Sequence, residues 1–182
     1  MFQDIAYFLI STVFSLYIAV VVIRLLLGLA RADFYNPISQ QLVKLTNPPL
    51  VILRRFIPSI GKVDTSAIVL AYGLMFVKVS LLYLVARGAV MFPESILIAF
   101  GEFLRIIVMV YIIALIVQAI ISWVGSAHGN PVAPLVHSLV NPIVRPIQKI
   151  VPTIGMIDLS PMVAILGLQV ILIVIDNTLP AF

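Results

Sequence analysis

The chain has 182 residues, of which 63% are hydrophobic and 10% are charged, with a formal net charge of +4. A soluble domain carries about 25% charged residues, so this composition excludes an ordinary soluble protein and predicts an integral membrane protein. The sequence has no cysteine, which excludes disulfides, thiolate metal sites and cysteine nucleophiles. In a membrane chain the distribution of positive charge sets orientation, so no direct nucleic-acid partner is expected.

Four apolar stretches predict an all-α membrane protein with four spanning helices, because about 20 apolar residues cross a bilayer core. The first two cover about 5–30 and about 66–86. The third covers about 96–124 and is long enough to tilt or to project beyond the core. The fourth covers about 160–179.

The connection between the first two spans predicts an amphipathic helical segment over 36–62. Asn36-Pro37 and Asn47-Pro48 each have the form of a helix start, with Asn as N-cap and Pro at the first helical position. Apolar residues fall on one side of the helical wheel, and Arg54 and Arg55 fall on the other. Such a segment is too short and too charged to span, so we expect it to lie in the headgroup plane.

The connection between the last two spans predicts a second interfacial segment, over 130–156. Asn130-Pro131 and Asn141-Pro142 repeat the start signals, and Arg145 and Lys149 lie on the polar face. Pro146 is expected to delay or kink this helix, because it removes a backbone donor.

These two segments contain a sequence repeat. Residues 47–66 read NPPLVILRRFIPSIGKVDTS, and residues 141–160, at an offset of 94, read NPIVRPIQKIVPTIGMIDLS. The chain is therefore predicted to be a tandem duplication of 1–88 and 95–182. Two crossings per half return the chain to its starting side, so the halves are parallel repeats related by an axis along the membrane normal. The repeated residues are Asn47, Pro48, Pro58, Gly61, Asp64 and Ser66 in the first half and Asn141, Pro142, Pro152, Gly155, Asp158 and Ser160 in the second.

Basic residues predict the orientation. The two long connections carry Arg31, Lys44, Arg54, Arg55, Lys62, Arg145 and Lys149. The turn over 86–95 carries only Arg87, and the tails carry no Lys or Arg. Because basic loops stay in the cytoplasm, we expect both connections and both interfacial segments there, and both termini in the periplasm.

Lys78 lies inside the second apolar stretch. An ionised lysine at mid-bilayer costs about 2.5–3.5 kcal/mol, so it needs a partner or a water-filled path. Glu102 and Asp176 are the candidate partners, and Arg105, one turn from Glu102, competes for it. An ion or proton pathway stays open beside the favoured interpretation, a structural salt bridge or snorkelling to the outer interface.

Arg24 is the second basic residue within a predicted span. It lies toward the cytoplasmic end of the first span, with Gln118 at the equivalent position of the third. Snorkelling or a hydrogen bond between helices is expected there, with substrate contact as the alternative.

Asp64 and Asp158 occupy equivalent positions and allow two interpretations. They could form a carboxylate pair for intramembrane proteolysis or a cation site, or each could cap the helix that follows. A catalytic pair needs its carboxylates about 3 Å apart in a cavity, whereas both residues are expected at the cytoplasmic surface, so capping is favoured.

The basic residues of the interfacial segments predict binding to anionic lipid headgroups, with a protein partner as the alternative. These residues are Arg54, Arg55, Arg145 and Lys149. Small residues in the second and fourth spans, Ala67, Ala71, Gly73 and Gly167, permit close helix packing or a homo-oligomer.

Signals for catalysis and for cofactors are absent from the sequence. His128 and His137 have no evident third ligand, so no metal site is expected. The chain has no phosphate-binding loop, no Gly-x-Ser-x-Gly elbow and no HExxH motif. We therefore expect no catalytic residue and no cofactor, and a protein that is not an enzyme.

The pattern NP…R-x-x-P-x-x-G-x-x-D-x-S, duplicated between hydrophobic helices, resembles the YggT family (YlmG in many bacteria and plastids). The segment DFYNPISQ at 33–40 also looks like proteobacterial members. Gln148 departs from the pattern, because Arg54 stands at the equivalent position. The resemblance covers nearly the whole chain. It implies a small protein of the bacterial inner membrane with no established activity, whose relatives are associated with osmotic tolerance, cell division or envelope organisation and, in plastids, with cytochrome maturation and nucleoid distribution.

Two functions follow as hypotheses. The first is a non-enzymatic membrane adaptor or assembly factor, because the repeated residues lie in the interfacial segments and not inside the spans. The alternative is a small oligomeric channel or transporter for K⁺ or protons, which rests on Lys78, Glu102 and Arg105.

Overall fold

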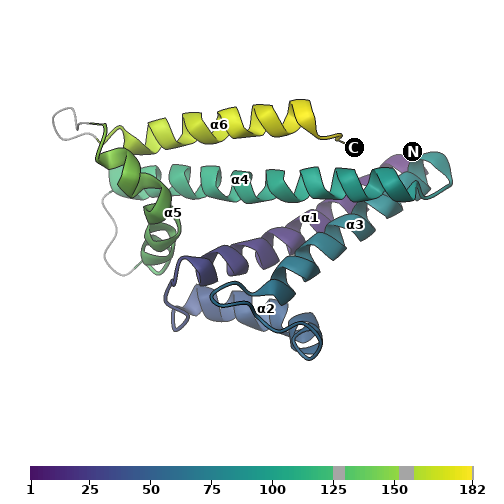
Figure 1. Cartoon of the computed structure of the whole chain (residues 1–182), viewed down its shortest axis with the longest axis horizontal. Coiled ribbons are helices and arrows are strands. Elements are labelled where there is room, and N and C mark those ends of the chain that lie inside the picture. The colour runs from purple at the N-terminus through teal and green to yellow at the C-terminus, as the bar shows by residue number, and fades with distance from the viewer. Residues whose placement is uncertain (125–129, 152–157, 182) are drawn as a thin grey trace.

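The computed structural model describes residues 1–124, 130–151 and 158–181, which form six helices (Figure 1). They are α1 (Phe2–Leu29), α2 (Pro37–Leu53), α3 (Thr65–Arg87), α4 (Phe92–Val124), α5 (Val132–Gln148) and α6 (Ser160–Thr178). Four of them, α1, α3, α4 and α6, are long and apolar enough to cross a membrane. The predicted all-α membrane class is confirmed at this level.

The helix ends agree with the predicted spans to within a few residues. The largest difference is at α4, which begins at Phe92 and not near 96. The expected turn there included Pro93, but a proline is tolerated in the first turn of a helix because its missing N–H has no partner in any case.

The four long apolar helices pack in the order α1, α3, α4, α6. The contact of α1 with α3 is the most extensive, followed by that of α3 with α4 and that of α4 with α6. Both chain ends lie at one end of these helices, and α2 and α5 lie toward the other (Figure 1). The core contains Ile18, Val21 and Val22 of α1 and Ala67 and Ala71 of α3, all fully buried.

Small residues differ in their contribution to this packing. Ala67 and Ala71 of α3 are fully buried, as expected of small residues that permit close helix approach. A Cβ added at Gly73 or Gly167 would meet nothing within 4 Å, so these glycines are not needed for packing within the chain. Gly101 of α4 differs, because a Cβ there would lie 3.1 Å from Cβ of Leu179, which would have to shift by a few tenths of an ångström.

The helix start predicted at Asn36 is confirmed, whereas the one predicted at Asn130 lies one residue later, with Pro131 as N-cap of α5. The Asn36 side chain accepts a hydrogen bond from the Ile38 N–H at 2.9 Å, and the Asn130 side chain accepts the equivalent bond from Val132, also at 2.9 Å. The starts predicted at Asn47-Pro48 and Asn141-Pro142 are wrong. Both pairs lie inside continuous helices, and Pro146 likewise lies within α5 without delaying its start.

A contact from α1 explains how α2 continues through its prolines. Pro49 has no N–H to donate to the carbonyl of Leu45, four residues earlier. The hydroxyl of Tyr17 donates to this carbonyl instead, at 3.2 Å. Because the donor lies in another helix, the sequence of the α2 segment alone could not predict it.

Candidate functional site

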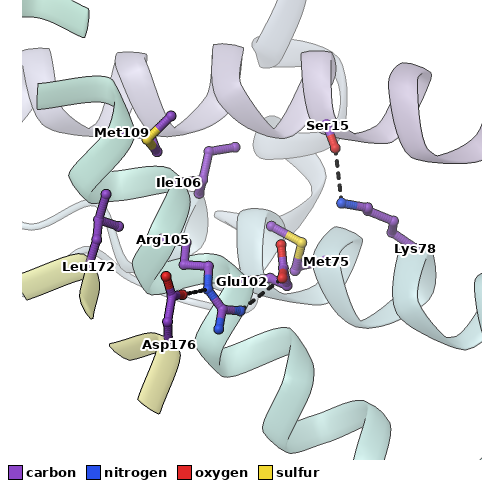
Figure 2. Close-up of a pocket in the computed structure, with 9 residues that line it drawn as sticks. All are labelled: Ser15, Met75, Lys78, Glu102, Arg105, Ile106, Met109, Leu172 and Asp176. Atoms are coloured by element: carbon purple, nitrogen blue, oxygen red, sulfur yellow. Dashed lines mark hydrogen bonds and ion pairs between the residues drawn. The ribbon is translucent and has the colours of Figure 1, made fainter. Parts of the chain in front are cut away.

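Charged side chains from α3, α4 and α6 line a cavity between the spanning helices (Figure 2). Arg105 Nε donates to Asp176 Oδ1 at 2.5 Å, and Arg105 Nη1 donates to Glu102 Oε1 at 2.9 Å. Lys78 Nζ donates to the hydroxyl of Ser15 at 3.0 Å. The four charged groups balance as two cations and two carboxylates, which lowers the cost of placing them among apolar helices.

Glu102 and Asp176 are therefore held by Arg105 and not by Lys78. The expected competition from Arg105 is confirmed, whereas the expected ion pair of Lys78 with Glu102 or Asp176 is wrong. Among the described residues, the ion pairs of both carboxylates are with Arg105. Lys78 is only 8% exposed and shares the cavity with Glu102.

The cavity has a volume of about 510 Å³ and a mixed lining. Its polar residues are Ser15, Lys78, Glu102, Arg105 and Asp176. Its apolar residues are Met75, Ile106, Met109 and Leu172. Ser15 was not predicted as a site residue, although a signal existed: Ser11 and Ser15 are polar breaks four residues apart in the first apolar stretch, and this spacing places them on one helix face.

Arg24 connects α1 to α2 at the other end of the helices. It is 8% exposed, and its Nη1 donates to Thr46 Oγ1 at 2.5 Å. Thr46, fully buried, donates in turn to the Leu42 carbonyl at 2.6 Å. The expected hydrogen bond between helices is confirmed. The second half lacks it, because Val140 stands at the position equivalent to Thr46.

A second candidate site lies where each amphipathic helix leads into the next span. Arg54, at the C-terminal cap of α2, forms an ion pair with Asp64, the N-cap of α3. In the second half Gln148 Nε2 donates to Asp158 Oδ2 at 2.8 Å. Gln148 therefore lacks the charge of Arg54 but contacts the equivalent aspartate. We call the Arg54–Asp64 and Gln148–Asp158 contacts the tethers.

Asp64 is the N-cap of α3, whereas Asp158 directly precedes Leu159, the N-cap of α6, and bonds the first N–H of that helix. Asp64 Oδ1 accepts from the Ala67 N–H at 3.3 Å, and Asp158 Oδ1 accepts from the Ser160 N–H at 2.9 Å. The capping interpretation is confirmed at Asp64, and each carboxylate is engaged by residues of its own half. These contacts give no support to a catalytic carboxylate pair.

The other repeated residues of the first half build the turn between α2 and α3. Ser66 donates its hydroxyl to the Ile57 carbonyl at 2.7 Å, and Thr65 donates to the Pro58 carbonyl at 2.5 Å. Gly61 has a φ of +60°, a left-handed conformation that favours glycine. Ser160 is fully buried, whereas Pro152 and Gly155 lie outside the described residues.

Exchanging the tether residues between the halves tests their equivalence. Arg54→Gln is expected to change the free energy of unfolding by less than about 0.5 kcal/mol, because glutamine makes this contact in the second half and exposed ion pairs contribute little. Asp64→Ala removes the helix cap and should cost about 1 kcal/mol. Unfolding in mixed micelles, followed by circular dichroism, checks both values. Equal losses in the two variants would contradict the tether interpretation.

Acid is expected to weaken the second tether. Hydrogen bonds from Ser160 and Gln148 to the carboxylate lower the pKa of Asp158 below the ordinary range of aspartate. A lowered pKa means that the folded state favours the ionised carboxylate. The resulting stabilisation of the fold is complete above the ordinary aspartate pKa, and it is lost as the pH falls through the lowered pKa of Asp158. Asp158→Asn should therefore flatten the acid limb of the stability curve measured between about pH 6 and pH 2. An unchanged acid limb would contradict this assignment.

The remaining basic residues of the two connections lie at the surface. Arg55, Arg145 and Lys149 are exposed, and within the described parts of the chain they form no ion pair. Arg54 differs from them because Asp64 holds it. Among the described residues no group of three His, Asp or Glu side chains could hold a metal ion; His128 lies outside this part of the chain.

Comparisons with known proteins give one consistent result. The CCB3/YggT family model matches residues 3–85 and 97–179, two segments offset by 94 residues. An uncharacterized protein of Vibrio alginolyticus is 42% identical over 89% of this chain and 88% of its own length. One from Pseudomonas aeruginosa is 38% identical over 97% and 90%, and the uncharacterized protein YggT of Escherichia coli K12 is 38% identical over 90% and 85%. No solved structure matches.

Proposed function

This chain belongs to the CCB3/YggT family, and from that premise we propose that it is a non-enzymatic membrane adaptor or organising factor of the bacterial inner membrane. Its docking surface is the basic platform, which we define as α2 and α5 with the exposed Arg55, Arg145 and Lys149. The platform faces the cytoplasm and binds anionic lipid headgroups and a protein partner. Through that partner it acts in osmotic tolerance, cell division or envelope organisation.

The observation that carries this proposal is that the platform is anchored to the spanning helices at both halves. The tethers hold the C-terminal ends of α2 and α5 against the starts of α3 and α6. Arg24 of α1 holds the middle of α2. Asn36 Nδ2 donates to the Pro131 carbonyl at 2.7 Å, which joins the starts of the two amphipathic segments. A surface held at so many points is pre-organised for binding, which reduces the entropy cost of docking.

The distribution of apolar side chains supports a location at the membrane surface. Val51, Ile52 and Phe56, near the end of α2, are at least half exposed, and Ile150, after α5, is 83% exposed. Exposed apolar side chains beside basic ones are typical of segments that lie in the headgroup region. The apolar groups enter the acyl boundary while the basic groups meet anionic phosphates.

Photo-crosslinking in living cells tests the adaptor function. A photoreactive amino acid at Arg55 or Lys149 should yield discrete adducts with one protein partner. The same amino acid at Glu94, in the first turn of α4, is the matched control and should not yield them. Adducts that are absent from both platform positions, or shared with Glu94, would contradict a partner-docking platform.

Ion conduction is the second candidate, and the charged cavity is the observation that favours it. Lys78, Glu102 and Arg105 line this cavity inside the spanning helices. Reconstituted protein would then carry K⁺ or protons across liposomes, and Lys78→Met would abolish the flux. If folded and inserted protein gives no more flux than protein-free liposomes, conduction by this chain alone is excluded. The adaptor proposal would remain intact.

A further inference from the structure

Three cavities follow one another along α1 and share lining residues. Gln3, Asp4 and Tyr7 line a cavity of about 360 Å³ next to the start of α1. Tyr7 also lines a cavity of about 140 Å³, together with Ser11, Lys78 and Glu102. Lys78 and Glu102 in turn line the cavity of about 510 Å³ that contains Ser15. The shared residues make the three cavities neighbours in one row, which we call the polar track.

The polar track follows a single face of α1. Gln3, Tyr7, Ser11 and Ser15 recur every four residues, a spacing that stacks side chains on one side of a helix. Twelve residues of α-helix rise about 18 Å, so this face leads from the end of α1 to its middle. Val13, between Ser11 and Ser15, and Leu16, next after Ser15, are 62% and 65% exposed, as expected of side chains that face lipid.

The track ends at a closed apolar layer. Ile18, Val21 and Val22, on the next turns of α1, have no exposed surface. Leu115 of α4 is also fully buried. On its buried face, α1 therefore offers only packed apolar side chains from Ile18 to Val22, and the track is blind.

The inner end of the track requires solvent. A lysine ammonium has three donors, and among the described residues the hydrogen bond of Lys78 is to Ser15. The larger cavity has room for on the order of ten waters, since each occupies about 30 Å³ in the liquid. Water there would satisfy the remaining donors of Lys78 and the free lone pairs of Glu102, both of which are costly to leave dry among apolar helices.

We propose that the polar track is a water-filled, one-sided proton-binding site, which opens at the end of the helices where Asp4 lies and ends at Lys78 and Glu102. The charged and titratable groups facing Lys78 are Tyr7 from α1, Glu102 and Arg105 from α4, and Asp176 from α6. A proton that arrives through the track binds the Glu102 carboxylate beside the Lys78 ammonium and leaves by the same route. The site responds to the pH on one side of the membrane and needs no path through it. It does not depend on the basic platform.

Single-cysteine labelling tests the water in the track, and the absence of native cysteine makes the chain ready for it. Ser11→Cys and Ser15→Cys replace one small side chain by another of similar shape. A charged, membrane-impermeant methanethiosulfonate should label both at least about tenfold faster than Val13→Cys and Leu16→Cys, because only a hydrated thiol ionises and reacts. It should do so only from the side where Asp4 lies. Rates at Ser15→Cys no faster than at Leu16→Cys, or equal from both sides, would overturn the proposal.

Proton binding has its own measurement. Infrared difference spectra of oriented, reconstituted protein should show a carboxyl signal after a pH step on the Asp4 side and none after a step on the other side. Glu102→Gln should remove this signal while Ser15→Cys remains labelled in the same background. If Ser15→Cys is labelled rapidly but the pH step gives no carboxyl signal that Glu102→Gln removes, the track holds water and binds no proton. That result would overturn the assignment.

Discussion

Arg105→Leu is expected to lower the free energy of unfolding by about 3 kcal/mol, because it leaves two carboxylates among the spanning helices without their cation. Arg105 is 15% exposed and Glu102 is 25% exposed, so both side chains lie mostly within the helix bundle. Asp176 is 55% exposed, which places the expected loss at the low end of the range for breaking a buried ion pair. Unfolding in mixed micelles of increasing sodium dodecyl sulfate measures the loss.

Neutralising the carboxylates separates charge from packing in this experiment. The triple variant Arg105→Leu, Glu102→Gln, Asp176→Asn should recover most of the lost stability, since no uncompensated charge remains. Arg55→Leu, exposed and without an ion pair among the described residues, is the control and should cost no more than about 0.5 kcal/mol. A triple variant as unstable as Arg105→Leu would show that the guanidinium acts through packing and not through its charge.

Reversing the charges of the basic platform should remove its preference for anionic lipid. Each basic residue near the surface contributes about 1 kcal/mol of attraction. The variant Arg55→Glu, Arg145→Glu, Lys149→Glu is therefore expected to weaken the preference for phosphatidylglycerol over phosphatidylcholine by about 3 kcal/mol, or roughly 100-fold. Electron paramagnetic resonance of spin-labelled lipids bound to the reconstituted protein measures this preference.

Arg54→Gln is the matched control for the charge reversal. Asp64 already neutralises Arg54, so losing this charge should change the lipid preference less than losing any one of the three exposed residues. High salt should also weaken the preference of the wild-type protein, because screening reduces surface attraction. A triple variant that still selects phosphatidylglycerol would contradict a lipid-binding platform.

Several features that depend on local sequence were predicted correctly, although the helix starts at Asn47 and Asn141 were not. The four apolar helices follow from hydrophobic length, and the caps at Asn36 and Asp64 follow from side chains that satisfy free backbone groups nearby. The sequence repeat also indicated that Gln148 departs from Arg54. Only the structure shows that both residues reach the aspartate at the same relative position, so the contact survives the loss of charge.

Features that depend on how helices rotate and align could not be predicted. Glu102 and Asp176 pair with Arg105 and not with Lys78. This pairing depends on how α3, α4 and α6 are rotated and shifted along one another, which the spacing of residues within one helix does not determine. The continuity of α2 depends on Tyr17, 28 residues before the carbonyl that it satisfies. The spacing of four residues predicts the polar face of α1. It does not predict that Lys78 and Glu102 line the same cavities.

The side of the membrane on which α2 and α5 lie tests the central claim most directly, since a cytoplasmic docking platform must face the cytoplasm. Cysteines introduced singly at Arg55 and Lys149 should react with an impermeant maleimide only after the inner membrane of spheroplasts is opened. A cysteine at Glu94 should react in intact spheroplasts. Labelling of Arg55→Cys and Lys149→Cys in intact spheroplasts, with Glu94→Cys protected, would place the platform in the periplasm and contradict the account.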